Sequence, residues 1–159
     1  MEEEEAYLRS YASSRRAVVV LARWKGEVIG ASTGVPMSEA ERCFQTPLVE
    51  AGESLDEWFY FGESVLHRAF RGQGIGHRFF DEREAHAVEL GFVRFGFCSV
   101  IREHDHPLKP GGYRPHDAFW TKRGYRIRDD WRVRLRWKQV DREDAGTENE
   151  LVYWTREGT

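Results

Sequence analysis

Short runs of apolar and β-branched residues, separated by polar or glycine-containing turns, predict strands along the whole chain. They are Ala17–Arg23, Val28–Val35, Glu57–Leu66, Phe92–Val100, Arg132–Val140 and Leu151–Arg156. The turn Trp24-Lys25-Gly26-Glu27 joins the first two strands into a hairpin. The last two strands predict another hairpin, so antiparallel pairs occupy both ends of the chain.

Helical signals lie between and before these strands. The expected helices are Glu2–Ala12, the stretch from the central glycine loop to Leu90, and Pro115–Lys122. Gly91 follows the long helix as its expected C-cap. We expect Pro36–Leu55 to be irregular and partly helical, and Arg102–Gly112 to be a loop.

No repeat, low-complexity tract or linker divides the sequence, so residues 1–159 are interpreted as one domain. The element order predicts a mixed α/β (α+β) fold in which helices flank a mostly antiparallel sheet. A strand–glycine loop–helix–strand unit lies in its middle. With 40% hydrophobic and 14% aromatic residues, the chain can bury a real core.

The composition of the chain indicates its cellular compartment and bears on whether it has a membrane partner. No stretch approaches the roughly 20 apolar residues of a membrane span, and no basic-then-apolar leader follows Met1. Two cysteines, Cys43 and Cys98, are too few for a disulfide scaffold and fit free thiols in a reducing compartment. We therefore expect a cytoplasmic protein with no membrane partner.

The charge is nearly balanced, with a formal net charge of −3, and the acidic run Glu2–Glu5 accounts for it. Such a balance argues against bulk nucleic-acid binding. One basic stretch, Lys122–Lys138, is an exception, because Arg132, Arg134 and Arg136 alternate with apolar residues there. A solvated strand face is one interpretation, and a surface that attracts a phosphate-bearing ligand is the other.

The glycine loop is the most informative feature of the sequence. Arg71-Gly72-Gln73-Gly74-Ile75-Gly76 lies between an aromatic-rich strand and a helix. Glycines let the backbone approach a ligand closely, and a helix N-terminus offers free N–H groups to an anion. The Walker pattern needs Gly-Lys-Ser/Thr, whereas His77-Arg78 follow here, and the spacing differs from the dinucleotide pattern G-x-G-x-x-G. A tight turn without a ligand remains the structural alternative.

The stretch from Leu66 to Phe80 resembles the acetyl-CoA motif of the GNAT superfamily of N-acetyltransferases: Arg or Gln, two free positions, Gly, one free position, then Gly or Ala. Arg71, Gly74 and Gly76 fill it. The segment Ala118–Tyr125 resembles the second signature of that family, a short helix that ends in Gly and an aromatic residue. The resemblance covers about Ala17 to Trp154.

The resemblance implies a GNAT-like sheet and acetyl-CoA as cosubstrate, without a metal. It implies that backbone amides of the loop hold the pyrophosphate; these belong to Arg71, Gly72, Gln73, Gly74, Ile75, Gly76 and His77. The resemblance also implies a bulge in the strand before the loop that splays it from the next strand, with the pantetheine arm in the gap, pairing near Val65 and Leu66. Trp120 is expected along the arm or the substrate pocket. An amine would attack the thioester directly, with no covalent enzyme intermediate.

The proton-transfer groups are less defined. Glu63, on the strand before the loop, is the expected general base, and aromatic neighbours could raise its pKa. Glu57 is the second choice. Family members often carry a general-acid Tyr where this chain has Trp120, so Tyr113, Tyr125, a water molecule or no acid at all remain candidates.

Other residues of the sequence suggest different chemistry. Histidines and aspartates cluster without a common zinc spacing, at His104, Asp105, His106, His116 and Asp117. Cys98 could be a nucleophile but fits a buried small hydrophobic residue better. Arg83, on the apolar helix face, is expected to pair with a buried carboxylate; a clamp for a substrate carboxylate is the alternative.

Two functional classes stay open: an enzyme that acetylates a small-molecule, peptide or protein amine, and a non-catalytic acyl-CoA-binding module. Nucleic-acid binding by the basic stretch is a weaker third. Family members normally begin with a further strand, for which residues 1–16 leave no room. We expect this strand to be missing, through an internal start or a trimmed N-terminus. The edge of Ala17–Arg23 would then be free for a partner chain, for example in a homodimer.

Overall fold

The computed structural model describes residues 14–101, 117–137 and 147–157. Its strands are β1 Val18–Trp24, β2 Glu27–Pro36, β3 Trp58–Leu66, β4 Arg94–Val100, β5 Arg126–Trp137 and β6 Thr147–Glu157. Its helices are α2 Arg42–Glu50, α3 Ile75–Glu89 and α4 Asp117–Lys122, with short 3-10 turns η1 Met37–Glu39, η2 Leu55–Glu57 and η3 Arg68–Phe70. The predicted helix Glu2–Ala12 and the loop Arg102–Gly112 lie outside the described residues.

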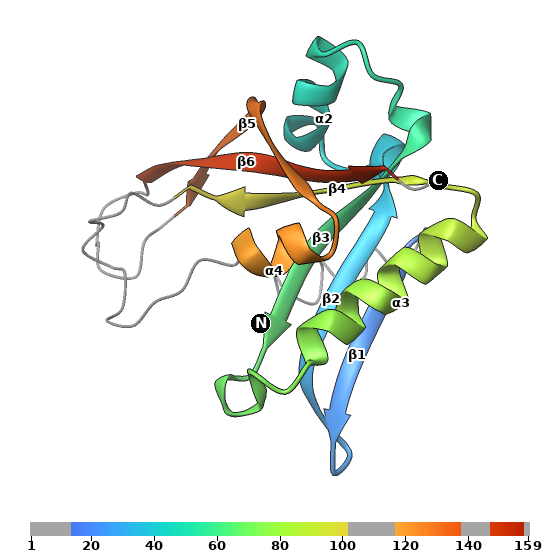
Figure 1. Cartoon of the computed structure of the whole chain (residues 1–159), viewed down its shortest axis with the longest axis vertical. Helices are drawn as coiled ribbons and strands as arrows, with labels where there is room; N and C mark the ends of the chain where they lie inside the picture. The colour runs from blue at the N-terminus through green and yellow to red at the C-terminus, as the bar shows by residue number, and fades with distance from the viewer. Residues whose placement is uncertain (1–13, 102–116, 138–146, 158–159) are drawn as a thin grey trace.

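The strands form one six-stranded sheet in the order β1-β2-β3-β4-β6-β5 (Figure 1). Its pairs are antiparallel except β3–β4, which is parallel because α3 carries the chain across between them. This confirms the predicted mixed, mostly antiparallel sheet with hairpins at both ends. Within the described residues β1 lies at one edge of the sheet, and its pairing with another chain remains a prediction.

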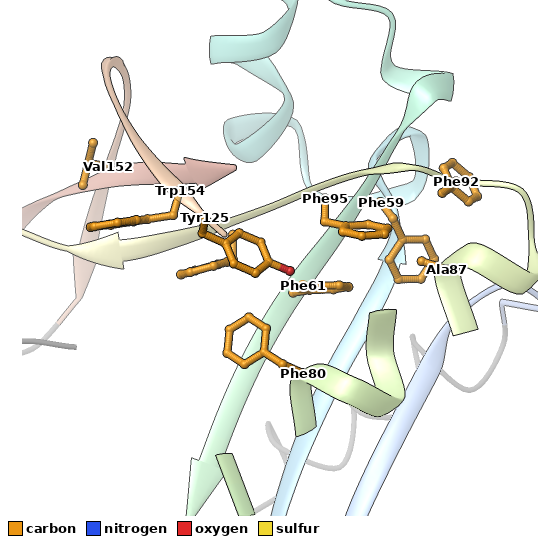
Figure 2. Packing of buried hydrophobic residues seen from close by; sticks show 10 residues of the cluster. Phe59, Phe61, Phe80, Ala87, Phe92, Phe95, Tyr125, Val152 and Trp154 are labelled. Atoms are coloured by element: carbon orange, nitrogen blue, oxygen red, sulfur yellow. The ribbon is translucent and has the colours of Figure 1, made fainter. Parts of the chain in front are cut away.

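Two apolar cores lie on opposite faces of the sheet, and β3 contributes to both through its alternating side chains. Phe59 and Phe61 join the cluster under α3, which Figure 2 shows together with Phe80 of that helix. Trp58 and Tyr60 join the other cluster, against which Leu48 of α2 packs. The aromatic run that predicted this strand therefore fills both faces of one buried strand.

The C-terminal hairpin differs from the prediction at its first strand. We expected a strand from Arg132, but β5 begins at Arg126 and carries a bulge between Arg128 and Arg132. The bulge inserts residues that break the alternating pattern, so the sequence resembled a turn at this point. Beyond it Arg132 and Arg134 are exposed around buried Val133, as the alternation predicted.

The basic stretch is partly neutralised on the folded surface. Arg132 forms an ion pair with Glu150 of β6 at 2.8 Å and approaches Asp129 at 3.8 Å. The guanidinium of Arg128 lies over the ring of Trp131, with its carbon 4.0 Å from the ring centroid. These contacts support the interpretation as a solvated strand face.

Arg83 of α3 is buried, with 2% of its surface exposed, but its partners differ from the prediction. Among the described residues, its guanidinium donates to the backbone carbonyls of Phe79 and Thr33 and pairs with no carboxylate. The sequence could not show this, because Thr33 lies on β2 and the bond depends on how α3 packs over the sheet. Within the part of the chain that the structure describes, backbone carbonyls take the place of the expected carboxylate.

None of the helices in the described part of the chain is both long enough and apolar enough to cross a membrane.

Candidate functional site

The glycine loop leads directly into the N-terminus of α3. Gly72 and Gly74 have φ angles of 80° and 86°, in the left-handed region that side chains disfavour. Gly74 is the N-cap, and the first helical hydrogen bond runs from the Arg78 amide to its carbonyl. The amides of the first helical turn, Ile75 to His77, therefore have no acceptor within the helix. Together with the helix dipole they form a site suited to an anion.

Two hydrogen bonds attach the segment before the loop to β2 and to the end of β3, and two more lie within that segment. The His67 amide donates to the carbonyl of Ile29 at 2.7 Å, and the His67 ring accepts from the Ala69 amide at 3.2 Å. Arg71 folds back, so that its Nε donates to the Leu66 carbonyl at 3.2 Å. The Arg71 amide donates to the Arg68 carbonyl. Of the amides that we expected to face a ligand, this one is therefore already engaged.

The strands on either side of the loop separate as they approach it. β3 pairs with β4 from Trp58 with Arg94 only as far as Tyr60 with Gly96. Figure 1 shows the two strands diverging beyond this point, with α4 near their open end. Within the described residues the β4-facing edge of β3 is unpaired with β4 from Phe61 to Leu66. Such an edge offers backbone donors and acceptors to an extended ligand.

Glu63 lies on this diverging part of β3, at a bulge. Pairing with β2 shifts between Ser32 with Ser64 and Gly34 with Phe61, which leaves Glu63 and Gly62 opposite Thr33. The Glu63 side chain is exposed, as is Val65 further along the strand. The structure therefore places Glu63 between the loop and the point where β3 leaves β4.

Helix α4 packs against the start of α3. The ring of Phe119 lies 4.2 Å from the ring of His77 and approaches the Cα of Gly76 closely enough to contact an added methyl group at 3.7 Å. Trp120 packs between Phe97 of β4 and Trp154 of β6, with ring centroids 5.0 and 5.1 Å away. Trp120 thus lies beside β4, and its predicted contact with the pantetheine arm remains a prediction.

An ionic cluster, which sequence reasoning missed, fastens α3 to the segment after α4. Arg123 donates to Glu84 at 2.7 Å and to Asp81 at 2.9 Å, and its NH1 lies 3.1 Å from Nδ1 of His77. Arg156 of β6 pairs with Glu84 at 3.1 Å. In the sequence these residues looked like surface charges, and only a contact between distant segments could have singled them out.

Tyr125, one candidate for the general acid, is committed to this cluster. Its hydroxyl donates to Glu84 at 2.7 Å, and 2% of its surface is exposed. Burial, reinforced by the Glu84 carboxylate, raises the pKa of Tyr125 well above the usual value. A buried phenol that already donates to a carboxylate is a poor proton donor to a substrate.

Of the remaining candidates, one lies at the opposite end of β3, one lies on β4 beyond its last pair with β3, and the others lie outside the described part of the chain. Glu57 lies at the opposite end of β3, where its carboxylate pairs with Arg94 at 2.6 Å. Cys98 lies on β4, and burial raises the pKa of its thiol to about 12. Tyr113, His104, His106 and His116 fall outside the described residues.

Comparisons with solved structures agree with this arrangement. A ribosomal-protein-alanine N-acetyltransferase from Brucella melitensis matches with a TM-score of 0.61 and 17% identity, covering 98% of this chain and 77% of that one. A GNAT family acetyltransferase from Elizabethkingia anophelis with acetyl-CoA bound matches with a TM-score of 0.54 and 17% identity, covering 98% and 82%. An aminoglycoside 6'-N-acetyltransferase complexed with coenzyme A matches with a TM-score of 0.63 and 12% identity, covering 99% and 81%. At these identities the likeness shows the fold.

Sequence comparison identifies the family. A search of the curated proteins found no match. The sequence model described as "Acetyltransferase (GNAT) family" matches residues 1–109, a stretch that includes the glycine loop. Because this match spans more than half of the chain, the protein belongs to the acetyltransferase (GNAT) family.

Proposed function

We propose that the protein transfers the acetyl group of acetyl-CoA to an amine of a small molecule, peptide or protein. The observation that carries the proposal is the loss of β3–β4 pairing after Tyr60 and Gly96, next to a helix N-terminus whose first amides have no acceptor within the helix. Among the residues that the structure describes, an anion site lies beside the stretch of β3 that does not pair with β4, as a ligand with a pyrophosphate and an amide-containing arm requires. Two of the similar structures contain acetyl-CoA or coenzyme A, which supports the same ligand here.

The residues present fit such a ligand. The amides of Ile75, Gly76 and His77, which lack helical acceptors, would hold the pyrophosphate. The backbone of β3 near Val65 and Leu66 would pair with the pantetheine arm, since β4 does not use that edge. Gly72 and Gly74 keep the approach open, because nothing lies within 4 Å of where a Cβ would be.

Acetyl-CoA supplies an activated acyl group, so the protein needs to position an amine and accept its proton. Glu63 is the proposed base, because its exposed carboxylate lies on the diverging part of β3. The amine nitrogen forms a bond to the acyl carbon, the carbon–sulfur bond breaks, and the amine proton passes to Glu63. Trp120 cannot supply a proton to the departing thiolate, and Tyr125 is held by Glu84, so Tyr113 or a water molecule is the proposed proton donor.

The test combines binding with turnover. Calorimetry with coenzyme A measures the binding site, and release of free thiol from acetyl-CoA with a panel of primary amines measures transfer. The Glu63→Gln variant is expected to bind coenzyme A as the wild type does and to lose about 10²–10⁴-fold in kcat.

Glu57→Gln is the matched control, because it changes a carboxylate on the same segment at the end paired with Arg94. It should leave kcat unchanged. If only Glu57→Gln lowered kcat, Glu57 rather than Glu63 would be the general base. Binding of coenzyme A without turnover of any amine would instead show a non-catalytic acyl-CoA-binding module and overturn the proposed activity.

A further inference from the structure

The bulge in β3 is supported by a side chain from the neighbouring strand. A bulge leaves a backbone group without its partner in the ladder of the sheet. Here the Glu63 amide donates to the hydroxyl of Thr33 on β2 at 2.9 Å. Thr33 has 2% of its surface exposed, so water offers little competition for this bond. The hydroxyl therefore takes the place of the missing backbone acceptor.

The backbone carbonyl of Thr33 accepts a hydrogen bond from Arg83 of α3. Its NH1 donates to the Thr33 carbonyl at 3.2 Å, while its Nε donates to the Phe79 carbonyl at 3.3 Å. The guanidinium carbon lies 4.7 and 4.8 Å from the ring centroids of Phe61 and Phe80, which Figure 2 shows on β3 and α3. One buried cation thus ties α3 to β2 at the bulge and packs against the strand that carries it.

These contacts lie where the sheet divides. Pairing between β3 and β4 ends at Tyr60, and Phe61, which packs against Arg83, is the next residue. Glu63 follows two residues later, and the edge at Val65 and Leu66 follows Glu63. Whatever fixes the backbone at the bulge therefore fixes the direction in which the proposed base and the proposed arm-binding edge leave the sheet.

We propose that Thr33 and Arg83 are positioning residues that hold the β3 bulge and so orient Glu63 and the edge at Val65 and Leu66. The catalytic consequence rests on the proposed function, whereas the effect on the backbone does not. A purely structural role in the core would lower stability without a selective effect at Glu63.

The first experiment measures amide hydrogen exchange by NMR. Thr33→Val removes the acceptor at similar volume, and Thr33→Ser restores it. Thr155→Val is the matched control, since Thr155 is 1% exposed and its hydroxyl, on β6, accepts from Arg128 of β5. Exchange at the Glu63 amide should rise about two- to tenfold in Thr33→Val, as expected for one lost hydrogen bond. It should stay unchanged in Thr33→Ser and Thr155→Val.

The second experiment measures steady-state kinetics on an amine that the wild type acetylates. Thr33→Val should lower kcat more than it raises KM for acetyl-CoA, and it should shift the pH dependence of kcat/KM. Thr33→Ser should recover both. Thr155→Val should keep wild-type kinetics even if its melting temperature falls as far as that of Thr33→Val.

Arg83→Lys tests the other half of the proposal. Lysine keeps the charge but cannot bond both carbonyls in the fork geometry of a guanidinium. Because Arg83 and Thr33 act on one bulge, the loss of kcat in the double variant with Thr33→Val should be smaller than the product of the two single losses. If the loss of kcat in the double variant equals the product of the two single losses, Arg83 does not act through the bulge that Thr33 holds.

The outcomes separate this inference from the proposed function. Unchanged exchange at Glu63 in Thr33→Val would overturn the inference whatever the activity. Faster exchange with unchanged kinetics would overturn the positioning role alone. If no amine is acetylated, the proposed function fails, while the exchange data still decide whether Thr33 holds the bulge.

Discussion

Cys98 illustrates at the scale of one residue how burial selects among chemical roles. It lies on β4 opposite Tyr153 of β6, and burial raises the pKa of its thiol to about 12. The reactive form of cysteine is the thiolate, so the raised pKa keeps the side chain protonated at neutral pH. Its environment argues against an acetyl-cysteine intermediate, as the direct attack that we propose requires.

We predict that iodoacetamide at pH 8 modifies Cys43 well before Cys98 in the folded protein. Burial raises the pKa of both thiols. A shift from 9.0 to about 12 leaves Cys98 with about a thousandfold less thiolate than an unperturbed cysteine at this pH. Peptide mass spectrometry after timed quenching measures both rates.

Urea-unfolded protein is the control for this labelling, since both thiols should react there at similar rates. Cys98→Ala should retain acetyl transfer. Acetylation of Cys98 after brief mixing with acetyl-CoA would contradict direct transfer and favour a two-step reaction.

At the scale of elements, the unit from β3 through α3 to β4 follows closely from the sequence. The aromatic run, the clustered glycines and the C-terminal Gly91 each mark a boundary through local chemistry. The helix, predicted to end near Leu90, ends at Glu89, and Gly91 has a φ angle of 96°. Local signals of this kind need no knowledge of the rest of the fold.

Other elements depend on contacts that a linear pattern does not contain. The position of the bulge opposite Thr33 depends on the register between β2 and β3. In β5, the bulge contains Asp129 and Asp130, two residues that are uncommon in strands, so the start of the strand at Arg126 was not predicted. Within α2, Pro47 made a helix hard to predict. Arg83 bonds a backbone carbonyl on a distant strand. The sequence shows only that an arginine lies on an apolar helix face, which suggests a carboxylate partner.

The glycines at the two ends of α3 allow a matched test of the anion site. Gly74 and Gly91 both have positive φ angles, and nothing lies within 4 Å of an added Cβ at either. Alanine should therefore cost each variant about 1–2 kcal/mol of unfolding free energy from backbone strain. Urea denaturation measures this cost, and calorimetry measures affinity for coenzyme A.

Only Gly74→Ala is expected to weaken coenzyme A binding, because Gly74 precedes the free amides and Gly91 lies at the far end of the helix. Equal affinity in both variants would place the ligand elsewhere. Equal loss of affinity would mean that strain in α3, rather than the loop, controls binding.

At the scale of the whole molecule, the sheet is closed at one end and open at the other. Trp58 and Arg94 pair at the closed end, where Glu57 also bonds Arg94. At the open end the halves of the sheet meet through side chains, with Phe119 against His77 and Arg123 against Glu84. A ligand that pairs with β3 there would add backbone contacts where the described part of β4 makes none, so binding should stabilise the protein as a whole.

We predict that coenzyme A at a hundredfold excess over its Kd raises the unfolding free energy by about 2.7 kcal/mol, as ligand linkage requires. Adenosine 3',5'-bisphosphate and pantetheine, added together at the same concentration, should stabilise less, because only the linked molecule binds the loop and the strand edge in one event. In the coenzyme A complex, amide exchange should slow both at Ile75–His77 and at Val65–Leu66. Slowing confined to the helix start, with the bisphosphate as effective as coenzyme A, would show that the arm does not lie along β3, and the open end would then need another explanation.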